Sequence, residues 1–128
     1  ASFRAKLQKR SKKAPMLTIS KNHLDFYPRE DYDAMERQLA TKPDLQPEVQ
    51  ALRRLLIGQA TECPIDSQGR ILVAPALREH AQLRSKVTVV GNLQKIEIWH
   101  TELFEQDMQM TLARLEEIQR SVDKGSDH

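Results

Sequence analysis

The sequence predicts an α+β fold, rich in β structure, in which two copies of one strand-and-helix unit follow each other along the chain. Three observations support this prediction. Short apolar runs of strand length occur in pairs, amphipathic helices follow the pairs, and the two halves of the sequence can be aligned. The 128 residues are enough for one ordinary core or for two small interleaved units.

The first half of the chain alternates short strands with helices. Its predicted elements are a short helix within residues 1–10, strands at Met16–Ile19 and Leu24–Tyr27, a helix that carries Tyr32, Met35 and Leu39, and a helix that starts at Pro47. Pro28 ends the second strand, because proline cannot donate to a strand ladder. Val49, Leu52, Leu55 and Leu56 are expected to face the core, and Gly58 to close the last helix.

The second half is richer in strands. Its predicted elements are strands at residues 60–65 and 70–74 around a turn at 66–69, a short helix at 76–83, and strands at 86–90 and 95–99 around Gly91-Asn92. Asn and Gly favour the backbone angles of tight hairpin turns. Thr101 is placed to cap a final helix, in which apolar residues from Phe104 to Val122 recur with the period of one helix face.

The two halves align as an internal repeat. Phe3-Arg4 matches Leu77-Arg78, residues 17–19 match 87–89, and residues 24–27 match 96–99, with offsets of 74, 70 and 72 positions. In this alignment the first copy lacks a counterpart of the strand-turn-strand at residues 60–74. We therefore expect the parent protein to extend roughly 15 to 25 residues before Ala1, the length of that missing hairpin.

Positive charge is concentrated at the start of the chain. Residues 1–21 hold seven of the 20 basic residues and no acidic one, whereas the remainder holds 13 basic and 18 acidic residues. Such a segment gains free energy by releasing DNA counterions, although a solvated lysine-rich loop is the commoner case. The sequence has no apolar run of the ~20 residues that a membrane span needs, and its single cysteine favours a reducing cytoplasm.

The turn at residues 66–70 is the most informative segment. Asp66 can accept a hydrogen bond from the backbone two residues further on, and Gly69 tolerates positive φ, so these two residues are predicted to structure a tight turn. Arg70 then lies at the hairpin tip, where its planar guanidinium suits phosphate oxygens or a guanine edge. A salt bridge from Arg70 to Asp66 or Glu62, which only ties the turn together, is an equally good interpretation.

Residues 63–83 resemble the SpoVT/AbrB swapped-hairpin domain. The shared features are Asp66 four residues before Arg70, Gly69 directly before that arginine, Pro75 five residues after it, and a Leu-Arg pair on the next helix. Residues 48–99 resemble the MraZ family more narrowly. The segments that carry this likeness are Arg53-Arg54-Leu55-Leu56-Ile57-Gly58, Ala60-Thr61-Glu62-Cys63 and Ile96-Glu97-Ile98-Trp99. One departure is that Cys63 and Pro64 stand where AbrB-type domains place basic residues.

This resemblance implies a SpoVT/AbrB-type barrel in which the hairpins of two tandem repeats interlock, with flanking helices. It also implies homo-oligomeric rings that bind double-stranded DNA at promoter direct repeats and repress the cell-division and cell-wall gene cluster, in the cytoplasm and on the nucleoid. By position, Arg70 is the tip arginine of the second motif and Arg78 the helix arginine beside it. Arg4 matches that flanking position in the first copy, and Lys6 joins it as a DNA contact.

The resemblance also divides the chain into three parts. Residues 1–58 are expected to form the first repeat, without its N-terminal hairpin, together with a connecting helix. Residues 59–108 form the second repeat, and residues 109–128 form a C-terminal helix extension and tail.

Other chemistry is weakly indicated. The sequence contains no phosphate-loop, nucleophile-elbow or dinucleotide-binding glycine pattern, so we expect no catalytic residues, no cofactor and no small-molecule substrate. Cys63 is interpreted as a small strand residue, and the four histidines, which lack zinc-like spacing, as surface or capping residues, so no metal site is expected. Two alternatives to a promoter-binding regulator are a ring-forming protein-interaction module and an AbrB-type antitoxin.

Overall fold

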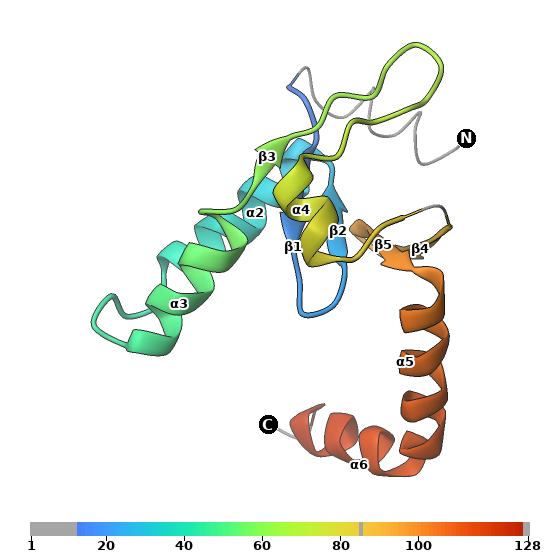
Figure 1. The fold of residues 1–128 in the computed structure, drawn as a ribbon. Helices are drawn as coiled ribbons and strands as arrows, with labels where there is room; N and C mark the ends of the chain where they lie inside the picture. The colour runs from blue at the N-terminus through green and yellow to red at the C-terminus, as the bar shows by residue number, and fades with distance from the viewer. Residues whose placement is uncertain (1–12, 85, 127–128) are drawn as a thin grey trace.

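The computed structural model describes residues 13–84 and 86–126, and it confirms an α+β fold (Figure 1). The described strands are β1 Met16–Ile19, β2 Leu24–Tyr27, β3 Thr61–Glu62, β4 Val87–Asn92 and β5 Lys95–His100. The described helices are α2 Arg29–Ala40, α3 Pro47–Leu56, α4 Pro75–His80, α5 Thr101–Ala113 and α6 Leu115–Ser126. The strands form one open antiparallel sheet in the order β3-β1-β2-β5-β4, and the swapped-hairpin barrel stays a prediction.

The two halves of the chain meet where β2 pairs with β5. Asp25 lies opposite Glu97, and on either side Leu24 pairs with Ile98 and Phe26 with Ile96. Asp25 and Glu97 are 72 positions apart. Leu24 is likewise 72 positions before Ile96, and Phe26 is 72 positions before Ile98, so the pair Leu24–Ile98 is equivalent to the pair Phe26–Ile96. The junction therefore has the pairing of a local pseudo-twofold axis that passes between Asp25 and Glu97.

The offset of 72 positions holds for both hairpins and for the helices that follow them, so the alignment of residues 17–19 with 87–89 is wrong by two residues. The aligned pair at residues 3–4 lies outside the described residues. In the first half Thr18 pairs with Asp25, and in the second half Val90 pairs with Glu97. The helices that follow keep the same offset. Tyr27 and Tyr32 make an edge-to-face ring contact at 6.1 Å between centroids, and Trp99 and Phe104 make the equivalent contact at 5.6 Å.

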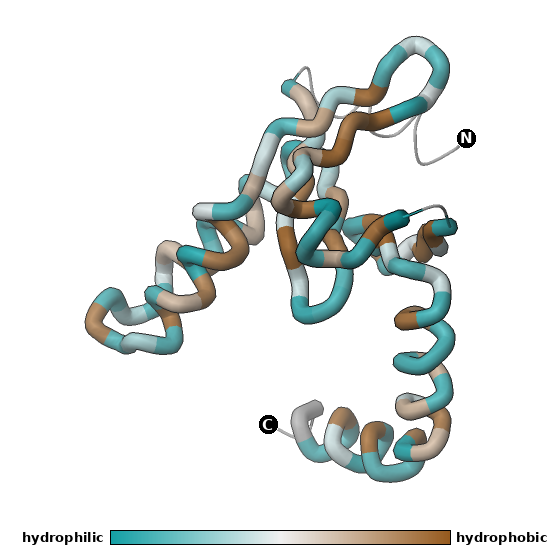
Figure 2. The backbone as a smooth tube through the Cα atoms, in the orientation of Figure 1, coloured by the Kyte–Doolittle hydropathy of each residue, from teal (hydrophilic) through white to brown (hydrophobic). Residues whose placement is uncertain are grey.

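The hydrophobic core lies on one face of the sheet. Alternate residues of the three central strands point into it, and α4 and the segment that leads to α4 cover it (Figure 2). Its buried members are Leu17, Ile19, Leu24, Phe26, Cys63, Leu77, Ala81, Leu83 and Ile98. Because side chains alternate along a strand, Thr18 and Asp25 project to the opposite face, where both are nonetheless buried.

The helices α2 and α3 form an arm beside the sheet. The prediction for α2 is confirmed, with Tyr32 buried and Glu30 and Asp31 in its first turn. In α3 only Val49 is buried, so the expectation that Leu52 and Leu55 face the core is wrong. Gly58 follows the helix end as expected. A glycine is needed there, because a Cβ at this position would lie 2.5 Å from the Arg54 carbonyl oxygen.

The predicted strand at residues 70–74 is absent from the described part of the chain, and only Thr61–Glu62 of the strand at 60–65 forms a ladder, with β1. One backbone hydrogen bond crosses the turn at this point, from the Asp66 nitrogen to the Arg70 oxygen at 2.8 Å. Residues 71–73 keep the burial alternation of a strand, with Ile71 and Val73 packed on the core and Leu72 exposed. Their backbone lacks a neighbouring strand among the described residues.

The hairpin of β4 and β5 turns later than predicted. Gly91 and Asn92 belong to β4, where they pair with Ile96 and Lys95, and the turn is made by the two residues that follow them. Leu93 adopts a φ of 58° there and is 95% exposed. The turn predicted at Gly91-Asn92 is wrong because register in this strand follows pairing with β5 and not the local turn preference.

The C-terminal segment is two helices, so the expectation of one continuous helix from Thr101 is wrong. Arg114 leaves the helical conformation between α5 and α6, and the two helices meet at a bend (Figure 1). The N-cap of α5 is His100, whose Nδ1 accepts a hydrogen bond from the Leu103 nitrogen, and not Thr101. Of the helices that the structure describes, none combines the length and hydrophobicity of a membrane span.

Helix α4 ends in a Schellman motif that has glutamine at the position usually taken by glycine. The Leu83 nitrogen donates to the Arg78 oxygen, and the Gln82 nitrogen donates to the Glu79 oxygen. Gln82 has a φ of 55°, and its neighbour Leu83 is buried against the core. A side chain with a Cβ is strained in this left-handed conformation.

We expect Gln82→Gly to raise the free energy of unfolding by about 1 kcal/mol, because glycine removes the left-handed penalty without disturbing either hydrogen bond. Urea denaturation measures the change. Gln82→Ala is the matched control, since it removes the same exposed side chain but keeps the Cβ, and it should leave stability nearly unchanged. An equal gain in both variants would contradict the backbone explanation.

Candidate functional site

The turn at residues 66–70 is structured by Asp66, as the sequence predicts. Its Oδ1 accepts hydrogen bonds from the Gln68 nitrogen at 2.9 Å and from the Arg70 nitrogen at 2.7 Å. Gly69 takes the positive φ, 80°, and donates its backbone nitrogen to the Asp66 carbonyl oxygen. The Asp66 carboxylate and Gly69 together hold the backbone of residues 66–70 in this turn.

Arg70 lies at this turn with its side chain 71% exposed. Its Nε pairs with Oδ2 of Asp66 at 3.2 Å, so the predicted salt bridge to Asp66 is present. That pair engages only one of the guanidinium nitrogens and is open to solvent, so it contributes little to stability. Contact between Arg70 and DNA stays a prediction.

The segment from the turn to α4 ties Arg70 to the core. Val73 packs on the core, and its carbonyl oxygen accepts a hydrogen bond from Nη2 of Arg78 at 3.5 Å. The loop between β3 and α4 projects away from the sheet, and its far end is the turn (Figure 1). Arg78, on α4, therefore supports the projecting loop that carries Arg70. Both arginines are exposed to solvent. Arg4 and Lys6, the other predicted DNA contacts, lie outside the described residues.

Cys63 lies at the base of the same loop and is buried. Its backbone nitrogen donates to the Pro15 oxygen at 2.8 Å, which continues the pairing of β3 with the β1 side. Burial raises the pKa of the Cys63 thiol to about 11, so the thiol is protonated at neutral pH. Because the thiolate is the nucleophile, this cysteine serves packing and not covalent chemistry.

We expect Asp66→Ala to release the turn and Asp66→Asn to preserve it, because the asparagine side chain still accepts from the backbone. Hydrogen exchange at the Gln68 and Arg70 amides, followed by NMR, measures the effect. Exchange in the alanine variant should be faster by roughly five-fold, the equivalent of ~1 kcal/mol for a lost hydrogen bond. Equal exchange in the two variants would show that the turn holds without the Asp66 side chain.

A second group of polar residues lies at the junction of the two halves. Asp25 and Glu97 face each other across β2 and β5, and His23 lies between them, with its Nε2 3.0 Å from Asp25 Oδ1 and 3.8 Å from Glu97 Oε2. Lys95 Nζ contacts Asp25 Oδ2 at 3.0 Å. The His23 ring stacks on Trp99 with 4.3 Å between centroids, and Trp99 Nε1 donates to Glu97 Oε1. We call these five residues the junction cluster.

The charges of the junction cluster stabilise one another. Burial alone raises the pKa of Asp25, but hydrogen bonds from His23 and Lys95 outweigh it, so the pKa of Asp25 is lowered overall. Burial likewise lowers the pKa of Lys95, but the hydrogen bond to Asp25 and the nearby negative charges together outweigh burial, so the pKa of Lys95 is raised overall. Asp25 and Lys95 are therefore both charged at neutral pH.

Sequence reasoning missed this cluster and placed His23 at the surface, which is wrong because only 9% of His23 is exposed. A signal was present. Asp25 stands between Leu24 and Phe26, and Glu97 stands at the equivalent place between two isoleucines. An acid at the same position of two aligned strands indicates a pair of carboxylates on the face opposite the core.

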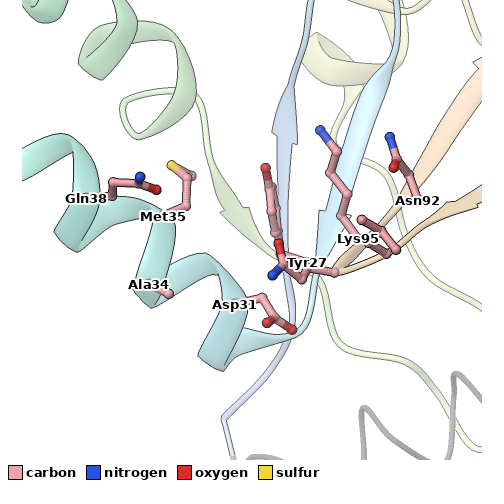
Figure 3. A pocket seen from close by; sticks show the side chains of 9 residues that line it. Tyr27, Asp31, Ala34, Met35, Gln38, Asn92 and Lys95 are labelled. Carbon is pink, nitrogen blue, oxygen red and sulfur yellow. The ribbon is translucent and has the colours of Figure 1, made fainter. Parts of the chain in front are cut away.

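A pocket of about 400 Å³ opens beside the cluster. Ala34, Met35 and Gln38 of α2 line one side of it, and Asn92 and Lys95 of the β4–β5 hairpin line the other, with Tyr27 near its base (Figure 3). Asn92 donates its Nδ2 to Glu97 Oε2 at 2.9 Å. The pocket wall therefore includes two residues that contact the carboxylates of the junction cluster directly.

We expect Lys95→Met to lower the free energy of unfolding by about 1–3 kcal/mol at neutral pH, less than for a fully buried pair because the lysine is partly exposed. The pair contributes fully only above the ordinary Asp pKa of 3.8 and below the ordinary Lys pKa of 10.5. The difference between variant and parent should therefore shrink as the pH falls below 3.8.

Denaturant unfolding at several pH values measures this difference. Arg114→Met is the control, since it removes the exposed pair of Arg114 with Glu117 and should leave stability unchanged. A loss of stability that is the same for both variants, or independent of pH, would contradict the assignment.

Comparison with known proteins gives one family. Residues 56–123 match the profile of the family described as "MraZ protein, putative antitoxin-like". Three relatives are each named "Transcriptional regulator MraZ". The protein of Halorhodospira halophila is 47% identical over 83 residues, which are 65% of this chain and 55% of the relative. That of Thioalkalivibrio sulfidiphilus is 44% identical over 73 residues, which are 57% of this chain and 49% of the relative.

The match to the third relative, from Actinobacillus pleuropneumoniae, is longer. It is 33% identical over 113 residues, which are 87% of this chain and 74% of the relative. The chain therefore spans about half the length of the first two relatives and about three quarters of the third.

Proposed function

The chain belongs to the MraZ family, and from this premise we propose that it is the DNA-binding part of a transcriptional regulator. The observation that carries the proposal is the exposed guanidinium of Arg70 at the end of a projecting, internally hydrogen-bonded turn. The relatives are named transcriptional regulators, which supports the same activity here. A narrow turn with one exposed arginine suits the major groove, where a guanidinium binds a guanine edge or adjacent phosphates.

In this proposal Arg70 contacts DNA directly, and Arg78 contacts the flanking phosphates in addition to holding the loop. Arg4 and Lys6 contribute phosphate contacts from the basic start of the chain. The chain divides into a first repeat at residues 1–58, a second repeat at 59–108 and an extension at 109–128, and the two repeats together make the swapped-hairpin barrel. The constant offset of 72 positions between Asp25 and Glu97 and between Thr18 and Val90 supports the two-repeat division.

The proposal includes assembly into a homo-oligomeric ring. Large apolar side chains on α5 and α6 are exposed in a single chain, and α5 extends away from the sheet, with α6 turning off its far end (Figure 1). These residues are Met108, Met110, Leu112, Leu115 and Val122. An exposed apolar surface of this kind is typical of a subunit interface. A ring would present several Arg70 turns in a row, so weak individual contacts would add up at successive promoter direct repeats.

The target that fits the proposal is the promoter of the cell-division and cell-wall gene cluster, repressed by a cytoplasmic, nucleoid-associated protein. The second candidate is a protein-interaction module, either a ring-forming scaffold or an antitoxin, and the exposed apolar residues of α5 and α6 favour it. The two functions differ in DNA specificity. A regulator retards DNA that contains the direct repeats more strongly than scrambled DNA, whereas a scaffold shows no preference.

We expect Arg70→Ala in the full-length protein to weaken binding to repeat-containing DNA by about 1–3 kcal/mol, as for loss of a bidentate arginine contact. Arg70→Lys keeps the positive charge but not the planar guanidinium, so it should retain only the part of the binding free energy that is due to charge. Fluorescence anisotropy at several salt concentrations measures both, with Arg114→Ala as the matched surface control. Unchanged affinity in Arg70→Ala would reject the assignment of Arg70.

A further inference from the structure

We propose that His23, Asp25 and Glu97 bind a divalent transition-metal ion at the junction of the two halves. Their ligand atoms all lie within 4.8 Å of one another, and the cluster offers one imidazole nitrogen and two carboxylate oxygens. The site is distinct from the Arg70 turn and requires no DNA. Its ligands come from β2, from β5 and from the turn that precedes β2, so one ion would join the two halves of the chain.

The distances suit a metal ion. With bonds of about 2.0–2.2 Å, the donors of a tetrahedral site lie roughly 3.3–3.6 Å apart. His23 Nε2 is 3.0 Å from Asp25 Oδ1 and 3.8 Å from Glu97 Oε2, so the two separations fall on either side of that range. Small side-chain rotations would therefore bring the three donors into coordination without a change in backbone pairing.

The charges also favour a cation. Asp25 and Glu97 lie directly opposite each other in the sheet, an arrangement that is destabilising for two like charges. Lys95 compensates one carboxylate by contact with Asp25 Oδ2. With a neutral imidazole, the cluster keeps one uncompensated negative charge in a largely buried place, where charges are usually paired or bound to a metal.

Neighbouring residues hold the carboxylates in the orientation that a metal site needs. Lys95 contacts Asp25 Oδ2, and Trp99 Nε1 donates to Glu97 Oε1, so Asp25 Oδ1 and Glu97 Oε2 are the oxygens nearest to His23 Nε2. Glu97 Oε2 also accepts a hydrogen bond from Asn92 Nδ2 and keeps a second lone pair for an ion. Such outer hydrogen bonds orient the ligands of metal sites. His23 is itself nine-tenths buried, and its Nδ1 has no hydrogen-bond partner among the described residues, so its polar contacts are all on the Nε2 side, toward the carboxylates.

The pocket beside α2 provides the route for an ion, because Lys95 and Asn92 belong both to its wall and to the contacts of the carboxylates (Figure 3). The donor set indicates the class of metal. One imidazole with two carboxylates suits Zn²⁺, Co²⁺, Ni²⁺ or Mn²⁺, whereas Mg²⁺ and Ca²⁺ prefer oxygen ligands alone.

The chain contains its own reporter for this site, because Trp99 is its only tryptophan and stacks on His23. We expect Co²⁺, added to untagged protein, to quench Trp99 fluorescence in a saturable way with one ion per chain. Zn²⁺ should compete with Co²⁺ and raise the Tm, since a ligand that binds only the folded state stabilises it, and Mg²⁺ should do neither.

His23→Gln should weaken Co²⁺ binding at least roughly 10-fold, the cost already seen for loss of an outer hydrogen bond in metal sites. His80→Gln is the matched control, since His80 is exposed and contacts the Ser20 oxygen, and it should bind Co²⁺ like the parent. Glu97→Gln, which keeps the shape of the cluster, provides a second test if His23→Gln fails to fold by circular dichroism. Equal quenching in the parent and in the variants that fold, or no quenching in the parent, would overturn the proposal.

Discussion

The antiparallel pairing of β2 with β5 is the constraint on which the rest of the structure depends. These strands come from opposite halves of the chain, so their ladder is what makes two short hairpins into one sheet. An isolated two-stranded hairpin is marginal in water. Without the pairing of β2 with β5, β4 and β5 would be such a hairpin, and β1 and β2 would have only the two residues of β3 beside them. Register here is set by burial, since a slip of one residue would turn Leu24 and Phe26 to the polar face and Asp25 to the core.

That one register determines both candidate sites. On the core face, the apolar residues of β2 and β5 support α4 and the segment through Val73, and this segment carries the turn with Arg70. On the other face, the same register brings Asp25 and Glu97 together, with Lys95 in contact with Asp25 and His23 between the two carboxylates. The projecting arginine and the junction cluster are therefore two consequences of one pairing, although they lie on opposite faces of the sheet.

Features that depend on local chemistry could be predicted from the sequence. The strands β1 and β2, helix α2 and the Asp66–Gly69 turn follow from periodicity, proline positions and side-chain hydrogen bonding within a few residues. Features that depend on distant partners could not. The β4–β5 turn moved past Gly91 because β5 sets the register, and residues 71–74 form no ladder because side-chain burial does not supply a neighbouring strand. The junction cluster joins residues 70 or more positions apart, so only the repeat alignment hinted at it.

The geometry of Arg70 limits how the proposed regulator could work. Its guanidinium already pairs with Asp66, so contact with DNA would exchange or share that partner. Replacing Asp66 by DNA as the partner of Arg70 costs little free energy, because the pair is exposed to solvent. Since Arg70 itself is exposed, its single contact with DNA also contributes only a modest binding free energy. A single copy would then discriminate poorly between sequences. Specificity would have to come from several copies at fixed spacing, which makes the exposed apolar residues of α5 and α6 as important to the proposed function as the arginine itself.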